Sequence, residues 1–123
     1  MTVALAVGLA GAVGAVARYL ADGAVQDRTS GPFPFGTQAV NCAGSLVLGI
    51  VTGLAWYHGL GGGAHALVGA GFCGAFTTWS SVSWETVRLA EDGLGRLALV
   101  NVVGGVAAAL VFGALGILVV AVV

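Results

Sequence analysis

Hydroxyl and amide side chains recur at helical spacing inside a long uncharged part of the chain. Thr37, Asn41 and Ser45 stand four residues apart, so an α-helix through them would bring all three onto one face. A row of hydroxyl and amide donors can replace the water shell of a small anion. The same stripe would also suit hydrogen bonding between packed helices, and the spacing alone leaves both interpretations open.

A second polar stretch runs from Gly71 to Glu85, and within it five hydroxyl residues follow Gly74. A continuous helix is poorly favoured there, because these hydroxyls can bond to the backbone groups that a break would free. Unwound carbonyls at membrane depth are ligands for a hard cation such as Na⁺. The alternative is a kinked helix whose hydroxyls are satisfied internally.

A few charged and titratable residues lie near these two polar stretches, and each has one or two plausible roles. Arg18 follows seventeen uncharged residues, so its side chain would either snorkel to the interface or supply positive potential at a pore mouth. Glu85 would be either a helix-end surface acid or a partner for a cation inside the membrane. His58 and His65 flank a glycine-rich loop without a carboxylate or thiol nearby, which disfavours a metal site.

The elements that must position these residues are membrane helices. Of the 123 residues, 59% are hydrophobic and 7% are charged, whereas an average soluble domain has roughly 25% charged residues. This composition excludes an ordinary soluble domain, a disordered segment and a nucleic-acid binder. A membrane-spanning helix needs about 20 apolar residues. We therefore expect one all-α transmembrane domain over residues 1–123, with four helices at roughly 3–20, 36–57, 65–88 and 96–121.

The formal charges fall in two clusters, one from Arg18 to Arg28 and one from Glu85 to Arg96. Four crossings place both clusters on one side of the cell membrane, and the positive-inside rule makes that side cytoplasmic. Small residues at close-packing spacing, such as Gly49 and Gly53, let the helices approach one another. Four short helices enclose too little volume for a pore, so we expect an oligomer.

Three motifs follow one another along the first three expected spans. They read Gly11-x-x-Gly14-Ala15-x-x-Arg18-Tyr19, then Pro34-Phe-Gly36-Thr37-x-x-Val40-Asn41-x-x-Gly44-Ser45, then Gly71-x-x-Gly74-x-x-Thr77-Thr78-x-Ser80-x-x-Ser83-x-Glu85. Together they resemble the Fluc/CrcB family of fluoride channels. The resemblance implies four-helix subunits with a break in the third helix, paired as an antiparallel dimer in membrane lipid. It also implies passive, selective export of fluoride that lowers its cytoplasmic concentration.

The resemblance further implies roles for single residues. It implies a structural Na⁺ at the dimer centre, held by the backbone carbonyls of Gly74 and Thr77. It implies a fluoride pathway in which amide, hydroxyl and aromatic-edge groups replace the hydration shell of the ion, lined by Asn41, Ser45, Thr78, Trp79 and Ser80. It assigns Arg18 and Glu85 to the vestibule or to gating.

The sequence also departs from the family pattern. A pair of phenylalanines expected at positions 79 and 82 reads Trp79 and Val82. Positions expected to carry an aromatic and hydroxyls in the fourth span read Asn101, Gly105 and Ala109, and that span has no Ser or Thr. These losses, with all arginines on one side, favour one subunit of a heterodimer of oppositely oriented paralogues over a homodimer.

The sequence disfavours an exporter and an enzyme as alternatives to a channel. A small proton-coupled multidrug exporter needs a titratable carboxylate within a span, and the first, second and fourth expected spans contain none. An enzyme is disfavoured because the chain offers no nucleophile–base pair. A non-conducting structural membrane subunit is the remaining alternative. Substitution of Asn41 would separate it from a channel, because only a channel would lose flux while keeping its assembly.

Overall fold

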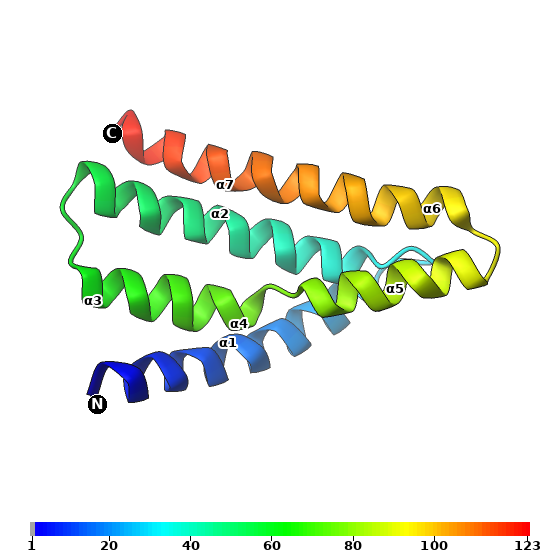
Figure 1. Ribbon diagram of the computed structural model, residues 1–123, viewed down its shortest axis with the longest axis horizontal. Coiled ribbons are helices and arrows are strands. Elements are labelled where there is room, and N and C mark those ends of the chain that lie inside the picture. Colours follow the sequence, from blue (N-terminus) through cyan, green and yellow to red (C-terminus); the bar gives the residue numbers. More distant parts are fainter. Residues whose placement is uncertain (1) are drawn as a thin grey trace.

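The computed structural model describes residues 2–123, and the chain in that range forms an elongated helical bundle without strands (Figure 1). The helices, in chain order, are α1 (Thr2–Gln26), α2 (Phe35–Tyr57), α3 (Gly62–His65), η1 (Ala66–Cys73), α4 (Gly74–Phe76), α5 (Trp79–Glu91), α6 (Gly95–Leu99), η2 (Val100–Gly104) and α7 (Gly105–Ala121). The segments η1 and η2 are π-helical turns that continue the helices on either side. The chain therefore makes four long rods, of which α3–η1–α4–α5 is the third and α6–η2–α7 the fourth.

Three of the four rods are long and apolar enough to cross a membrane as continuous helices. They are Thr2–Gln26, Phe35–Tyr57 and Gly95–Ala121, of 25, 23 and 27 residues, each longer than the roughly 20 residues that a crossing requires. The first helix continues past the expected end at residue 20, so Asp22 also lies within α1. The third rod does not qualify as one continuous helix, because it is interrupted.

The interruption lies at Thr77 and Thr78, whose backbones are extended, with φ/ψ of −83°/158° and −148°/124°. The α4 end is satisfied locally, because the backbone N–H and the hydroxyl of Thr77 both donate to the Cys73 carbonyl, at 2.9 and 3.0 Å. The α5 start is capped by the Thr78 hydroxyl, which accepts from the Ser81 backbone N–H at 3.2 Å, as hydroxyl residues commonly do at a helix N-terminus. The hydroxyl-rich stretch thus supports a break in the third rod.

Close helix packing depends on glycines. The second and fourth rods meet at Gly49 and Gly116, where an added Cβ would collide with the Gly113 and Leu46 carbonyls respectively. The first and third rods meet at Gly14, where an added Cβ would collide with the Phe72 carbonyl. Backbone thus lies against backbone at both contacts, as small residues permit in membrane bundles.

The outer surface of the bundle is apolar. Leu9 on α1 and Leu110 on α7 are each 70% exposed, and similar side chains follow along both helices. Such a surface is unstable in water and suits a surrounding of lipid or of another subunit.

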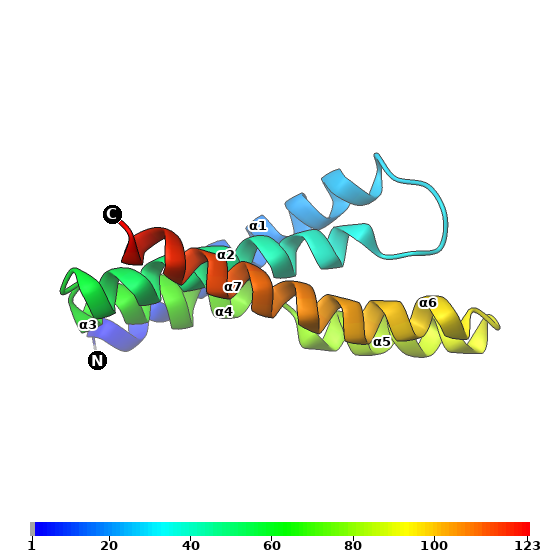
Figure 2. The same ribbon diagram turned by 90° about the horizontal axis from the view of Figure 1, so that it is seen from above.

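The two ends of the bundle differ in charge. Figure 1 shows both chain ends at one end of the bundle, beside the α2–α3 turn, whereas the α1–α2 and α5–α6 connections lie at the opposite end. The charged clusters belong to that opposite end, which we call the charged end. Figure 2 shows the end of α1 and the following loop extending away from α5 and α6 there.

Candidate ion pathway

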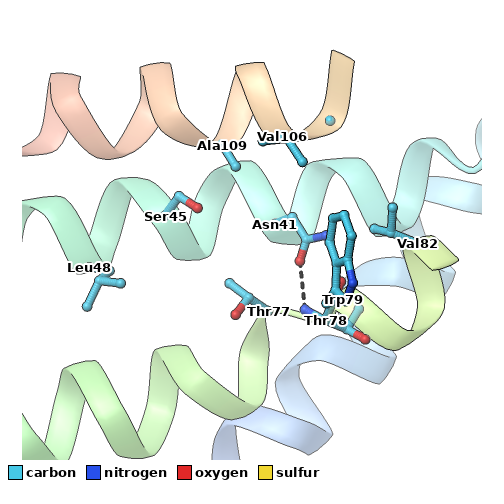
Figure 3. Close-up of a pocket in the computed structure, with 10 residues that line it drawn as sticks. Asn41, Ser45, Leu48, Thr77, Thr78, Trp79, Val82, Val106 and Ala109 are labelled. Carbon is cyan, nitrogen blue, oxygen red and sulfur yellow. Dashed lines mark hydrogen bonds between the residues drawn. The ribbon is translucent and has the colours of Figure 1, made fainter. Parts of the chain in front are cut away.

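A cavity of about 220 Å³, here called the break cavity, lies beside the interruption of the third rod (Figure 3). One wall is polar and is formed by α2 together with the extended residues of the break. The opposite wall is apolar and is formed by the start of α7 and by α5. The lining residues are Asn41, Ser45, Leu48, Thr77, Thr78, Trp79, Val82, Gly105, Val106 and Ala109.

Asn41 connects the polar wall directly to the break. Its Oδ1 accepts a hydrogen bond from the Thr78 backbone N–H at 2.7 Å, and its Nδ2 donates to the Thr78 carbonyl at 3.0 Å (Figure 3 marks the shorter bond). The carboxamide therefore satisfies both backbone groups of an extended residue, much as a neighbouring strand would. Within residues 2–123, the second Nδ2 hydrogen of Asn41 has no partner, so the side chain retains one donor for a ligand.

Hydroxyl groups surround the same point. The Thr78 hydroxyl lies 3.1 Å from that of Ser80 and 3.2 Å from that of Ser81. Ser80 itself is exposed and does not line the break cavity. Ser45 lines the cavity one turn of α2 away from Asn41. An anion in this cavity would therefore meet an amide and several hydroxyl groups on one side.

Trp79 and Gly74 lie on the surface of the bundle next to the break. Trp79 lines the break cavity and is 61% exposed, so its indole stands at the mouth of the cavity. Gly74 is also exposed, and an added Cβ there would meet nothing closer than 3.8 Å. Both residues are therefore accessible from outside the bundle.

The apolar wall contains the positions at which the sequence departs from the family pattern. Gly105, Ala109 and the buried Val82 contribute no polar side-chain group to the cavity. Asn101, one turn before Gly105, is 0% exposed and is not among the lining residues. The single amide of the fourth rod therefore faces the interior of the bundle rather than the cavity.

A second cavity, of about 760 Å³, opens at the charged end between the end of α1, Pro34 and Glu85. One carboxylate oxygen of Glu85 accepts from the Thr37 hydroxyl at 2.5 Å, and the other, Oε2, is buried without a hydrogen-bond partner within residues 2–123. Arg18 is half-buried on α1 and is not among the residues lining this cavity.

The structure brings together most of the residues singled out from the sequence, but not all. Asn41, Ser45, Thr77, Thr78 and Trp79 line one cavity. Thr37, although on the same helix as Asn41 and Ser45, bonds to Glu85 at the charged end instead.

Sequence reasoning missed a polar contact behind the apolar wall, in which the buried Asn101 bonds to the half-buried Gln38 and Thr86. The available signal was the amide of Asn101, isolated in the apolar fourth span, since an amide in hydrocarbon requires a partner. Spacing along one helix does not reveal which residue of another helix that partner is.

A bundle of apolar rods with a broken third rod and a polar cavity at the break defines a multi-pass protein of the cell membrane. Residues 5–117 match the family model described as CrcB-like protein, Camphor Resistance (CrcB). The chain belongs to this CrcB family, which confirms the resemblance drawn from the three motifs. The family is one of ion channels and not of enzymes.

Curated relatives cover most of the chain. The protein named fluoride-specific ion channel FluC 1 of Leifsonia xyli is 50% identical over 102 residues, which cover 83% of this chain and 74% of the relative. FluC 2 of Haloarcula marismortui is 50% identical over 105 residues, which cover 85% of this chain and 82% of the relative. FluC 2 of Natronomonas pharaonis is 49% identical over 114 residues, covering 93% and 90%.

Proposed function

We propose that this chain is a subunit of a fluoride-selective channel that exports F⁻ passively and so lowers its cytoplasmic concentration. The observation that carries the proposal is the break cavity, where Asn41, Ser45 and the threonines of the break converge. Relatives that are about half identical and cover most of the chain are named fluoride-specific ion channels. A cavity of donors at membrane depth fits the conduction of a small anion.

The chemistry of the cavity suits a strongly hydrated ion that must also leave. The free Nδ2 hydrogen of Asn41 and the Ser45 hydroxyl replace water as donors, since the Thr77 and Thr78 hydroxyls already donate to Cys73 and Ser81. The Trp79 indole adds an N–H and a positive ring edge. The apolar wall adds no further ligands, so an ion in the cavity would be coordinated from one side only.

We further propose that the break cavity is completed by a second, antiparallel subunit. Trp79, Ser80 and Gly74 are exposed at the break, although hydroxyl and backbone groups are costly to expose to lipid. A subunit covering this face would remove them from lipid and close the cavity.

A structural Na⁺ at this face is also part of the proposal. The extended backbone at Thr77 ends α4, and the last carbonyls of a terminated helix lack intrahelical partners. Gly74 and Thr77 would hold the ion through their carbonyl oxygens, which are the ligands that hard cations prefer. Residues 2–123 offer no group of three or more His, Cys, Asp or Glu as an alternative. Once bound, Na⁺ would supply positive charge beside the anion pathway.

The partner subunit we propose is a paralogue of opposite orientation. Three observations favour a heterodimer over a homodimer. The wall formed by Val82, Gly105 and Ala109 lacks polar groups, and all arginines lie at the charged end. The relatives carry the numbers 1 or 2 in their names, as expected where one organism has two such chains.

Fluoride efflux from liposomes tests this proposal. Liposomes containing only this chain are loaded with fluoride, and release is followed with a fluoride electrode, with chloride as the control anion. Rapid F⁻ release with Cl⁻ retained supports the channel and contradicts the obligate heterodimer. No release from folded protein, restored by co-reconstitution with a paralogue, supports the heterodimer. No release in either case contradicts the channel and favours a structural subunit.

A further inference from the structure

A group of polar side chains, one buried and two half-buried, lies behind the apolar wall of the break cavity. Asn101 of η2 is at its centre and is 0% exposed. Gln38 of α2 and Thr86 of α5 lie on either side of it. We call these three residues the Asn101 cluster, and none of them lines the break cavity.

The hydrogen bonds of the Asn101 cluster form one continuous chain through three rods. The Gln38 Nε2 donates to the Oδ1 and to the carbonyl oxygen of Asn101, at 2.5 and 3.1 Å. The Asn101 Nδ2 donates in turn to the Thr86 hydroxyl at 3.0 Å and to the Val82 carbonyl at 3.3 Å. An unpaired amide buried in the bundle would be costly. The cluster therefore specifies how the second, third and fourth rods sit against one another.

The cluster contacts the wall of the break cavity at two points. The Val82 carbonyl accepts from Asn101 and also from the Thr86 hydroxyl, at 2.6 Å, while Val82 itself lines the cavity. Gly105 also lines the cavity, and a Cβ added there would collide with the Gln38 carboxamide. Both wall residues are thus held from behind by the cluster.

The backbone around Asn101 is adapted to this contact. Asn101 lies in the π-helical turn η2 (Val100–Gly104), and such turns are uncommon and frequently accompany functional sites. The Asn101 carbonyl accepts from the Gly105 backbone N–H as well as from Gln38. The Asn101 carbonyl in this turn therefore bonds both to Gln38 of α2 and to Gly105, which begins the cavity wall.

We propose that Asn101, supported by Gln38 and Thr86, is a positioning residue for anion conduction. It fixes Val82 and Gly105 opposite the polar stripe of α2 and thereby sets the width of the break cavity. This inference rests on the proposed channel function. It also explains the bare cavity wall of the fourth rod, because the one amide of that rod holds the wall instead of lining it.

The experiment measures fluoride efflux per reconstituted protein and the F⁻-to-Cl⁻ rate ratio. It uses whichever assembly releases fluoride, the chain alone or with its paralogue. The variants are Asn101→Leu, Gln38→Leu, Thr86→Val and the double variant Gln38→Leu/Thr86→Val. For Asn101→Leu we expect both the efflux rate and the rate ratio to fall about tenfold. The efflux rate of the double variant should be no lower than that of the slower single variant, because the Gln38 and Thr86 substitutions both act through Asn101.

Two further variants distinguish the loss of the hydroxyl that bonds to Asn101 from the loss of any hydroxyl on α5. Ser83 and Thr86 both lie on α5, and each hydroxyl donates to the carbonyl four residues earlier. Only Thr86 also accepts from Asn101. Ser83→Ala should therefore leave efflux and selectivity unchanged, and Thr86→Ser should restore what Thr86→Val loses.

The outcomes are distinct. A purely structural role would lower the yield of assembled protein and leave the rate ratio of the assembled fraction unchanged, which would overturn the proposal. Additive losses in the double variant would overturn it as well. If Asn101→Leu fails to assemble, the milder Thr86→Val and Thr86→Ser pair decides by the same ratio. Absence of fluoride release from the unaltered protein contradicts the channel function itself, so the two failures are distinguishable.

Discussion

Asn41 and Asn101 are the same residue type in two surroundings: Asn41 donates to a carbonyl within the break, and Asn101 donates to a carbonyl of the helix that follows it. Asn41 bonds to the extended backbone of Thr78 and lines the break cavity, whereas Asn101 bonds to Val82 and is 0% exposed. Within residues 2–123, Asn41 keeps one N–H without a partner, while both Nδ2 hydrogens of Asn101 have one.

The comparison separates two uses of an amide in a membrane bundle. A fully bonded amide fixes the geometry of its helices and offers nothing to a ligand. A partly bonded amide can fix a helix break and still present a donor to a passing ion. Hydrogen bonds between membrane helices are worth about 0.6 kcal/mol on average and up to about 1.7 kcal/mol, so neither amide is expected to decide stability alone.

The largest effect is expected from Asn41→Leu, which tests the ligand side of the comparison directly. The substitution removes the free donor and both bonds to Thr78. We expect fluoride efflux to fall about 100-fold, since losing a hydrogen bond to a charged group costs roughly 1.5–3 kcal/mol. Fluoride-electrode efflux assays measure this. Gel filtration should show an unchanged assembly, and efflux at the unaltered rate would contradict the role of Asn41.

Removal of Na⁺ should affect the break and spare the Asn101 cluster. When protein purified without Na⁺ is assayed in N-methylglucamine, we expect efflux to fall about tenfold. Returning Na⁺ should restore the efflux rate, because the Gly74 and Thr77 carbonyls that are proposed to bind the ion remain in the protein. Matched liposomes in the two cations measure this. Equal rates in both would count against the Na⁺ site.

Gly105→Ala should disturb the Asn101 cluster without changing any of its residues. The added methyl would collide with the Gln38 carboxamide and displace it from Asn101. We expect efflux to fall about threefold and the free energy of unfolding to fall by about 1 kcal/mol. Efflux and thermal unfolding measure the two effects. When Gly105→Ala is combined with Gln38→Leu, fluoride efflux should fall little further than in the slower single variant, because both substitutions act on the contact between Gln38 and Asn101. If the two reductions in efflux instead multiply, the shared mechanism is wrong.

Gly49→Ala is the matched control for that variant. Its added methyl would meet the backbone carbonyl of Gly113, which cannot move aside as a side chain can. The expected defect is therefore a lower yield of folded protein rather than an altered rate.

The smallest effect is expected from Ala109→Ser, which adds a hydroxyl to the apolar wall. One additional hydrogen bond contributes about 0.5–1.5 kcal/mol, so we expect fluoride efflux to rise about threefold. The same efflux assay, with Ala109→Val as a control of larger size without a donor, measures it. A slower rate in both variants would indicate that the wall limits the cavity by its volume and not by its lack of donors.

Much of the architecture was predictable because it depends on composition along the chain. Long apolar stretches specify membrane helices, and a glycine followed by closely spaced hydroxyls is typical of a break that can satisfy its own backbone. The rotation of each helix was not predictable. The fourth rod is apolar on all sides, so its sequence does not indicate whether Asn101 faces a cavity or the bundle interior. The pairings of Asn41 with Thr78 and of Thr37 with Glu85 likewise join residues far apart in the chain.

Both chain ends lie at the same end of the bundle, opposite the charged connections (Figure 1). Two copies joined head to tail by a short linker would therefore be held parallel, with their charged ends on one side of the membrane. A single polypeptide containing two antiparallel copies would need an odd number of additional membrane crossings in its linker. For the proposed antiparallel pair, gene fusion would therefore require the gain of a further helix, whereas separate genes could reverse one copy by redistributing arginines between its loops.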